Sequence, residues 1–177
     1  MRRIFVVGMM GAGKSTVGKR LAARLGLDFV DADRELEARC GAGIPLIFDI
    51  EGEAGFRRRE AALLDELTQR DRIVVGTGGG AVLDPGNRAM LSARGLVIYL
   101  RATAHELWTR TRRDRNRPLL QTPNPRERIE QLVAERDPLY REVAGLIVDT
   151  GRQPVEHVVR AILERLPPEL LAERSDA

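Results

Sequence analysis

Apolar and polar positions follow two different periods along the chain. Short apolar or β-branched runs, each of a length typical of a buried strand, occur at 4–7, 28–31, 72–77, 96–100 and 146–150. Elsewhere apolar residues recur every three or four positions, which predicts helices at about 14–25, 33–40, 54–70, 86–94, 103–111, 125–144 and 154–166. This alternation predicts a three-layer α/β/α fold, in which helices cover both faces of a parallel sheet.

One connection between the predicted elements has no apolar face. After the helix at 103–111 no apolar side chain follows until Pro118, which also disfavours a helix at Arg117. The next helix begins after Asn124, with a proline at its first position and an acid three positions after the cap, as in a capping box. A connection of about a dozen residues is more typical of a functional lid than of a passive link. We expect a lid at about 112–124.

The length and composition fit one globular domain. The 177 residues suffice for a core, and we place a single domain at 1–166, followed by a disordered tail at 167–177. With 43% hydrophobic and 31% charged residues, the chain is not of the disordered class. All but two of the 29 basic residues are arginines, but the formal net charge is only +3. The charge therefore gives weak support for a nucleic-acid partner.

The cysteine and histidine content narrows the chemistry further. The single cysteine, Cys40, excludes an internal disulfide and fits a reducing compartment. A catalytic thiol needs a base, and the two histidines, His105 and His157, lie in polar helical segments. The first apolar run is too short for a signal peptide, and no run approaches the length that spans a bilayer. We expect a cytoplasmic monomer without a membrane or nucleic-acid partner.

The strongest chemical motif follows the first predicted strand. The stretch GMMGAGKS at 8–15 matches GxxxxGK[ST] between a strand and a helix. Its glycines allow a tight turn whose N–H groups point at phosphate oxygens, and the positive end of the helix dipole faces the same point. Lys14 is placed to reach the β- and γ-phosphates, and the Ser15 hydroxyl to ligate Mg²⁺. The residues expected to bind the nucleoside triphosphate here are Gly11, Ala12, Gly13, Lys14, Ser15 and Thr16.

The second and third predicted strands end in acidic and glycine residues, at the edge where such sheets bind ligands. The second ends in DAD (31–33) and the third in GGG (78–80), where a motor-type ATPase often has an acid. Asp31 is then the best candidate to hold Mg²⁺ through water alongside Ser15, and Asp33 is free to orient an attacking hydroxyl. Two alternatives stay open: Asp33 as a helix N-cap, and the glycines as a flexible turn rather than a place of close ligand approach.

Two arginines occupy positions that suggest anionic partners. Arg136 falls on the apolar stripe of the helix at 125–144, so its guanidinium points inward and needs an anion. Arg57 lies near the start of another apolar stripe, three positions before Glu60. This spacing is compatible both with a simple salt bridge and with a ligand contact.

With these motifs in place, the chain resembles the shikimate kinases. The matching stretches run in that family's order over about 3–165: GMMGAGKST, DADRE, FDIEGEAGFRRRE, GTGGGAV, RDRNRPLL and ERDPLYRE. The resemblance implies a five-stranded parallel sheet of the P-loop kinase fold, with a mobile lid and a substrate-binding helical segment at about 33–61. It implies phosphorylation of the 3-hydroxyl of shikimate by ATP with Mg²⁺, in the route to chorismate and the aromatic amino acids.

The resemblance also implies roles for single residues. Asp33 resembles the aspartate at the substrate hydroxyl and Asp31 the one associated with Mg²⁺, while Arg57 and Arg136 resemble the pair that grips the shikimate carboxylate. The expected substrate-binding residues are Asp33, Arg57, Gly79, Gly80 and Arg136, with the Gly79 backbone in contact.

Further roles concern the nucleotide. Arg117 resembles the lid arginine that contacts ATP, and Arg110, Arg152 and Gln153 resemble positions that flank adenine. The expected catalytic residues are Asp33, Lys14 and Arg117, the last two offsetting charge on the transferring phosphoryl group.

Three other functions share parts of this pattern. A gluconate or nucleotide kinase shares the P-loop, but the inward Arg136 and the GTGGG strand end favour a carboxylated polyol. A regulatory GTPase needs an NKxD motif, and no lysine follows Lys19. A nucleic-acid-dependent ATPase needs a larger core, an acidic end to the third strand and aromatic residues near the basic run.

Overall fold

The computed structural model describes residues 1–114 and 118–171. Its centre is a five-stranded parallel sheet with the strand order β2-β3-β1-β4-β5. The strands are β1 (Arg3–Val7), β2 (Asp28–Asp31), β3 (Ile73–Gly76), β4 (Leu96–Arg101) and β5 (Leu146–Asp149). Each predicted strand is present and every pairing is parallel, so the expected fold class is confirmed.

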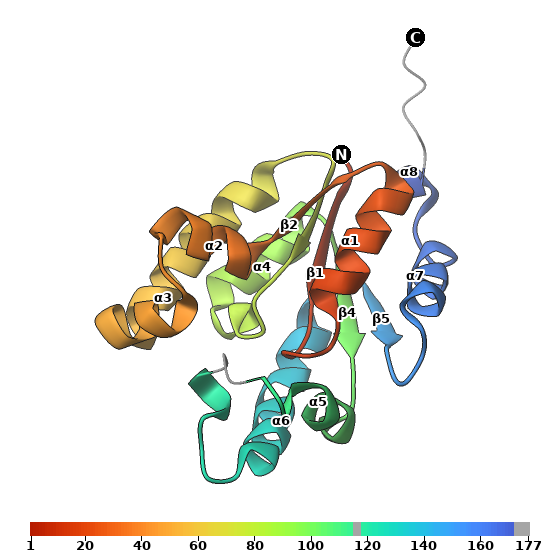
Figure 1. Cartoon of the computed structure of the whole chain (residues 1–177). Coiled ribbons are helices and arrows are strands. Elements are labelled where there is room, and N and C mark those ends of the chain that lie inside the picture. The colour runs from red at the N-terminus through yellow and green to blue at the C-terminus, as the bar shows by residue number, and fades with distance from the viewer. Residues whose placement is uncertain (115–117, 172–177) are drawn as a thin grey trace.

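Helices cover the sheet on both faces (Figure 1). They are α1 (Lys14–Leu25), α2 (Ala32–Cys40), α3 (Ile44–Gln69), α4 (Pro85–Arg94), α5 (Ala104–Thr111), α6 (Pro125–Val143), α7 (Val155–Leu163) and α8 (Pro168–Leu171), with 3-10 turns η1 (Ala81–Leu83) and η2 (Pro118–Leu120). On one face α1 packs against α7, and on the other α4 and α6 pack against β4 and α3 packs against α4. None of the helices in the described ranges is both long enough and apolar enough to cross a bilayer.

The helix expected at 54–70 extends further toward the N-terminus. In the structure α3 also includes residues 44–51, and the two parts meet at a kink at Gly52, whose φ of 70° lies in the left-handed region. The first part gives no clear helical stripe because its apolar residues do not share one environment: Ile47 is buried, whereas Ile50 is 74% exposed. This missed helix lies inside the segment at 33–61 that we expected to bind substrate.

The expectation of a disordered tail from 167 onward is wrong for residues 168–171. They form α8, whose Leu170 side chain is buried. The Arg2 guanidinium donates two hydrogen bonds to the Leu170 carbonyl (3.1 and 2.9 Å) and one to the Leu25 carbonyl (2.9 Å). Burial and these bonds offset the entropy of ordering the short helix. Residues 172–177 lie outside the described residues.

Of the lid expected at about 112–124, residues 112–114 and 118–124 are among the described residues. The 3-10 turn η2 buries Leu120, and α6 begins at Pro125 as predicted. The Asn124 side chain makes no cap hydrogen bond, so the predicted capping box is wrong. A capping box forms instead at the start of α5, between Thr103 and Glu106. Arg117 lies outside the described residues.

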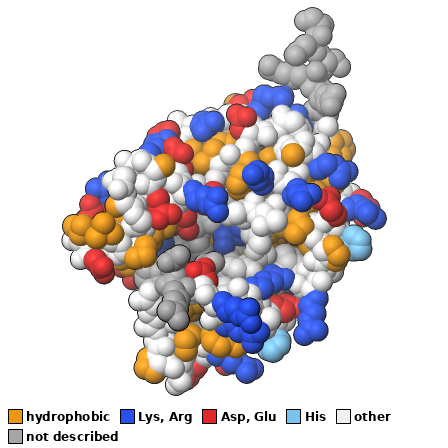
Figure 2. Space-filling model, viewed as in Figure 1, with side chains coloured by type: hydrophobic (Ala, Val, Ile, Leu, Met, Phe, Trp, Pro, Cys, Tyr) orange, Lys and Arg blue, Asp and Glu red, His pale blue; other side chains and the backbone are white. Residues whose placement is uncertain are grey.

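Charged side chains on the surface are mixed in sign. Figure 2 shows basic and acidic side chains interspersed over the face in view, consistent with the low net charge. His105 and His157 are exposed, and Cys40 is half-buried.

Candidate active site

The phosphate-binding loop, residues 8–15, leads from β1 directly into α1. Its cap residue, Gly13, has no side chain to satisfy the first N–H groups of α1, so these groups remain directed at the loop's concave side. Gly11 has a φ of 78°, and a Cβ there would stand 2.6 Å from the Thr111 methyl carbon of α5. The Lys14 ammonium donates to the Met9 carbonyl at 2.8 Å and so lies over the loop. This arrangement fits a polyphosphate.

Asp31 connects this loop to the end of β2. One carboxylate oxygen accepts a hydrogen bond from the Ser15 hydroxyl, and the other accepts from the Arg34 N–H (3.1 Å), which caps α2. Asp31 is thus the N-cap of α2, and the N-cap alternative for Asp33 is wrong. The Ser15 and Asp31 oxygens are ligand types that Mg²⁺ prefers, and they lie together beside the phosphate-binding loop.

A cavity of about 120 Å³ lies next to the loop. Phe48, Phe56 and Leu119 supply apolar wall. The five residues expected to bind substrate all line it: Asp33, Arg57, Gly79, Gly80 and Arg136. A second hollow runs along the phosphate-binding loop and α2, and shares Asp33 and Gly79 with the cavity. Asp33 therefore lies where the phosphate side and the cavity meet.

The glycine run after β3 lets charged side chains approach the backbone closely. A Cβ on Gly78 would stand 2.7 Å from both Asp33 Oδ1 and Glu60 Oε1. A Cβ on Gly80 would overlap the Arg57 guanidinium, with its Cζ only 2.6 Å away. The alternative of a merely flexible turn is disfavoured, because larger residues here would displace the charged groups around the cavity.

The sequence left two roles open for Arg57, a salt bridge to Glu60 and a ligand contact, and the structure is compatible with both. Arg57 Nη1 donates to Glu60 Oε2 at 2.7 Å, and Arg57 also lines the cavity. Within the described residues four buried side-chain nitrogen and oxygen atoms have no hydrogen-bond partner: Arg57 Nε, Glu60 Oε1, Arg136 Nε and Arg136 Nη1. Arg136 is only 2% exposed, as its place on the apolar stripe predicted. Such groups are costly to bury unless a ligand completes their bonding.

Burial also changes the protonation of the two cavity carboxyls. It raises the pKa of the Asp33 carboxyl above its ordinary value of 3.8, although the nearby Lys14 ammonium lowers it. Burial likewise raises the pKa of the Glu60 carboxyl above 4.5, against the attraction of the Arg57 guanidinium. Both carboxyls are therefore better proton acceptors than exposed ones.

The residues expected near adenine occupy the other end of the phosphate-binding loop. The Arg110 guanidinium donates to the Gly11 carbonyl at 3.1 Å and to the Gly151 carbonyl, so it joins the loop to the segment after β5. Arg152 and Gln153 follow in that segment and are exposed. None of these three residues lines the cavity that contains Asp33 and Arg57.

Among the residues that contact the cavity or its wall, Leu119 and Tyr140 were not singled out as ligand-site residues by the sequence. Leu119 lies in η2, and its only sequence signal is that it follows Pro118 in an otherwise polar stretch. Tyr140 was placed on the buried stripe of α6, but its hydroxyl also donates to the Gly79 carbonyl at 2.5 Å. No local pattern indicates that bond.

Fold and site together define a class of protein. A P-loop beside a cavity with two inward guanidiniums and a half-buried aspartate is the arrangement of a P-loop kinase that phosphorylates a small hydroxylated acid.

The comparisons with known proteins are more specific. The family model for shikimate kinase matches residues 10–167. The chain is 62% identical over 159 residues to a shikimate kinase of Aromatoleum aromaticum, which covers 90% of this chain and 91% of that relative. A solved shikimate kinase from Acinetobacter baumannii, in complex with shikimate, has a TM-score of 0.91 and 48% identity over 93% of this chain and 92% of its own. The chain belongs to the shikimate kinase family and is a kinase.

A more distant structural neighbour shares the fold but is named for a different acceptor. A gluconokinase from Sinorhizobium meliloti covers 95% of this chain and 94% of its own with a TM-score of 0.61, but at 21% identity. That likeness concerns the fold. The choice between acceptors therefore depends on the cavity residues.

Proposed function

We propose that the protein transfers the γ-phosphoryl group of ATP to the 3-hydroxyl of shikimate, in the route to chorismate and the aromatic amino acids. The observation that carries this proposal is the pair of cavity arginines. Arg57 and Arg136 present buried nitrogen atoms without a partner in the described residues, beside Asp33 and the phosphate-binding loop. A guanidinium binds a carboxylate through strong, charge-assisted hydrogen bonds.

In this proposal the chain acts mainly by positioning and by charge stabilisation. Arg57 and Arg136 hold the substrate carboxylate, and the Gly79 backbone, with Gly80 beside it, contacts the ring hydroxyls. Asp33 orients the 3-hydroxyl and accepts its proton, for which its raised pKa suits it. Lys14 offsets the negative charge that grows on the transferring group.

Magnesium is proposed to be held through Ser15 and Asp31, whose oxygens already lie in hydrogen-bond contact. The described residues contain no group of three or more His, Cys, Asp or Glu side chains suited to a metal. This donor set fits Mg²⁺, which takes few protein ligands and keeps waters and phosphate oxygens. When bound, the ion supplies positive charge that neutralises the β- and γ-phosphate oxygens.

The remaining roles concern the nucleotide and the lid. We propose that Arg110, Arg152 and Gln153 flank the adenine, and that Arg117 in a lid at about 112–124 contacts the γ-phosphate. Closure of such a lid excludes water that would otherwise hydrolyse ATP. We propose a monomer that works in the cytoplasm, with a domain at 1–166.

The test is ADP release with shikimate, gluconate and nucleoside monophosphates assayed side by side. We expect turnover with shikimate alone. Arg136→Ala should raise KM for shikimate by about 10- to 100-fold, the loss expected for a hydrogen-bonded charge, with little change in KM for ATP. Arg141→Ala is the matched control, because Arg141 lies on the same helix but its guanidinium pairs with Asp137. Turnover on a nucleotide but not on shikimate would overturn the proposal.

A further inference from the structure

The segment between β3 and α4 is held in place by its carbonyl groups. The carbonyls of Gly78 and Gly80 accept from N–H groups of the same turn, at 3.2 and 3.1 Å. Those of residues 81–83 accept from side chains of α4: Asn87 at 3.0 Å, and Arg88 at 2.8 and 3.3 Å. Only one carbonyl of residues 78–83 remains, and its partner comes from a different helix.

That remaining carbonyl belongs to Gly79, and it accepts the Tyr140 hydroxyl of α6 at 2.5 Å. A trans peptide points its C=O and the following N–H in opposite directions, and the described residues contain no cis peptide. Holding the Gly79 carbonyl toward α6 therefore turns the Gly80 N–H away from α6. Glycine on both sides leaves no side chain to restrict rotation of this peptide. The Tyr140 hydroxyl thus restrains the Gly79 carbonyl by a hydrogen bond from another helix.

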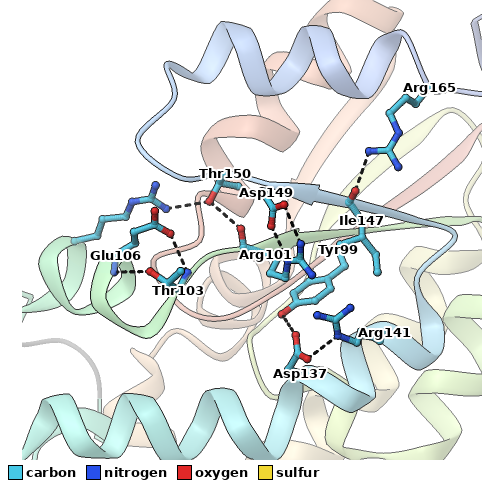
Figure 3. A network of polar contacts seen from close by, with 11 residues as sticks. Tyr99, Arg101, Thr103, Glu106, Asp137, Arg141, Ile147, Asp149, Thr150 and Arg165 are labelled. Atoms are coloured by element: carbon cyan, nitrogen blue, oxygen red, sulfur yellow. Dashed lines mark hydrogen bonds and ion pairs between the residues drawn. The ribbon is translucent and has the colours of Figure 1, made fainter.

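Tyr140 itself is well fixed. Its side chain is fully buried, and its ring centroid lies 4.9 Å from that of Tyr99 on β4. The Tyr99 hydroxyl donates to Asp137 of α6 at 2.8 Å, and this bond ties α6 to the sheet (Figure 3). Asp137 also accepts from Arg141 of the same helix at 2.6 Å. Burial raises the pKa of Tyr140 to about 12, so its hydroxyl keeps its proton at neutral pH. It therefore acts as a donor throughout the working range.

The same helix also carries the inward arginine. Arg136 lies one turn before Tyr140, and a Cβ on Gly79 would be 3.4 Å from Arg136 Nη1. Helix α6 thus brings both the Arg136 guanidinium and the Tyr140 hydroxyl close to Gly79. Moving one relative to the other would change the shape of the cavity that both border.

We propose that Tyr140 is a positioning residue for substrate binding, whose hydroxyl fixes the Gly79–Gly80 peptide so that the Gly80 N–H faces the hydroxylated acid held by Arg57 and Arg136. The inference rests on the proposed function for the nature of that acid. Tyr140 touches no substrate; it acts through the backbone of Gly79.

The test replaces the hydroxyl and keeps the ring, as Tyr140→Phe. KM for shikimate should rise by about tenfold, the effect of one lost hydrogen bond, while KM for ATP stays unchanged. The unfolding temperature of the unliganded variant confirms that it folds. Amide NMR of protein labelled with ¹⁵N-glycine gives a second readout, because a freed peptide changes the Gly80 amide shift before any substrate is added.

Tyr99→Phe is the matched control. It removes a hydroxyl from the neighbouring ring and one hydrogen bond to Asp137, but leaves the Gly79 carbonyl with its donor. KM for shikimate should be unchanged in this variant. An unchanged KM and an unchanged Gly80 amide shift in Tyr140→Phe overturn the inference, as does an equal rise in KM in both variants. Absence of shikimate turnover in the wild type contradicts the proposed function instead, and the amide shift then still tests the peptide orientation.

Discussion

At the scale of single residues, the cavity holds charges that the protein pairs only in part. Glu60 is 2% exposed, with one oxygen bonded to Arg57 and the other without a partner in the described part of the chain. Burial of a carboxylate with one partner costs free energy that a well-packed neutral side chain does not. Residues that keep Arg57 in place for a ligand therefore reduce the stability of the free protein.

The substitution Glu60→Gln should change how the stability of the protein depends on pH. Burial raises the pKa of Glu60 in the folded state above 4.5; Arg57 and Arg136 oppose this shift, and Asp33 adds to it. The proton on Glu60 therefore stabilises the fold fully below about pH 4.5, and this stability is lost as the pH rises through the raised pKa. Because glutamine does not titrate, the variant should gain in unfolding temperature relative to wild type from acid to neutral pH, without ligand. A difference that is independent of pH contradicts the prediction.

How well single residues could be predicted depends on how locally their partners lie. Lys14, Ser15 and Asp31 are set by a motif and by the end of the next strand, and the structure brings them together as expected. The bond from Tyr140 to Gly79 joins residues 61 positions apart and no periodic pattern encodes it. Its presence follows only from how α6 packs behind the sheet.

At the scale of elements, the end of β3 determines the shape of the site. Gly80→Ala would place a methyl group on the Arg57 guanidinium and displace it. We expect KM for shikimate to rise by about 10- to 100-fold, as for loss of a charged hydrogen bond, with KM for ATP little changed. Gly76→Ala is the control at the same strand end, because a Cβ there meets the Phe29 ring at an ordinary 3.6 Å. Equal kinetics of the two variants contradict this role for Gly80.

Elements with one buried face could be predicted from sequence, and those without one could not. The apolar runs of β1 and β3 and the α1 stripe bury the residues that the pattern marks. The first part of α3 has apolar residues both inside and outside, because it borders the cavity instead of packing wholly on the core. A helix that forms part of a ligand cavity loses the regular period on which such prediction depends.

At the scale of the whole molecule, the two ends of the described chain are joined away from the cavity. Figure 1 shows α8 near the N-terminus of β1, at the opposite end of the sheet from η2. Arg2, only 8% exposed, binds carbonyls of α1 and α8 rather than a carboxylate. This contact closes the core over the ends of the strands. It should contribute to stability but not to the chemistry.

Leu170→Ala and Leu171→Ala separate these two contributions. The Leu170 side chain is 6% exposed and that of Leu171 is 43% exposed, and neither substitution removes the carbonyl that Arg2 binds. Loss of the buried leucine should lower the free energy of unfolding by about 2 kcal/mol, at the low end for buried leucines because the helix is short. That corresponds to a fall of about 4–8 °C in unfolding temperature, whereas Leu171→Ala should change stability by less than about 0.5 kcal/mol. Both variants should keep wild-type kcat and KM well below their unfolding temperatures, because neither residue lines the cavity. A loss of shikimate affinity in Leu170→Ala at such temperatures would instead mean that α8 affects the geometry of the site through β1.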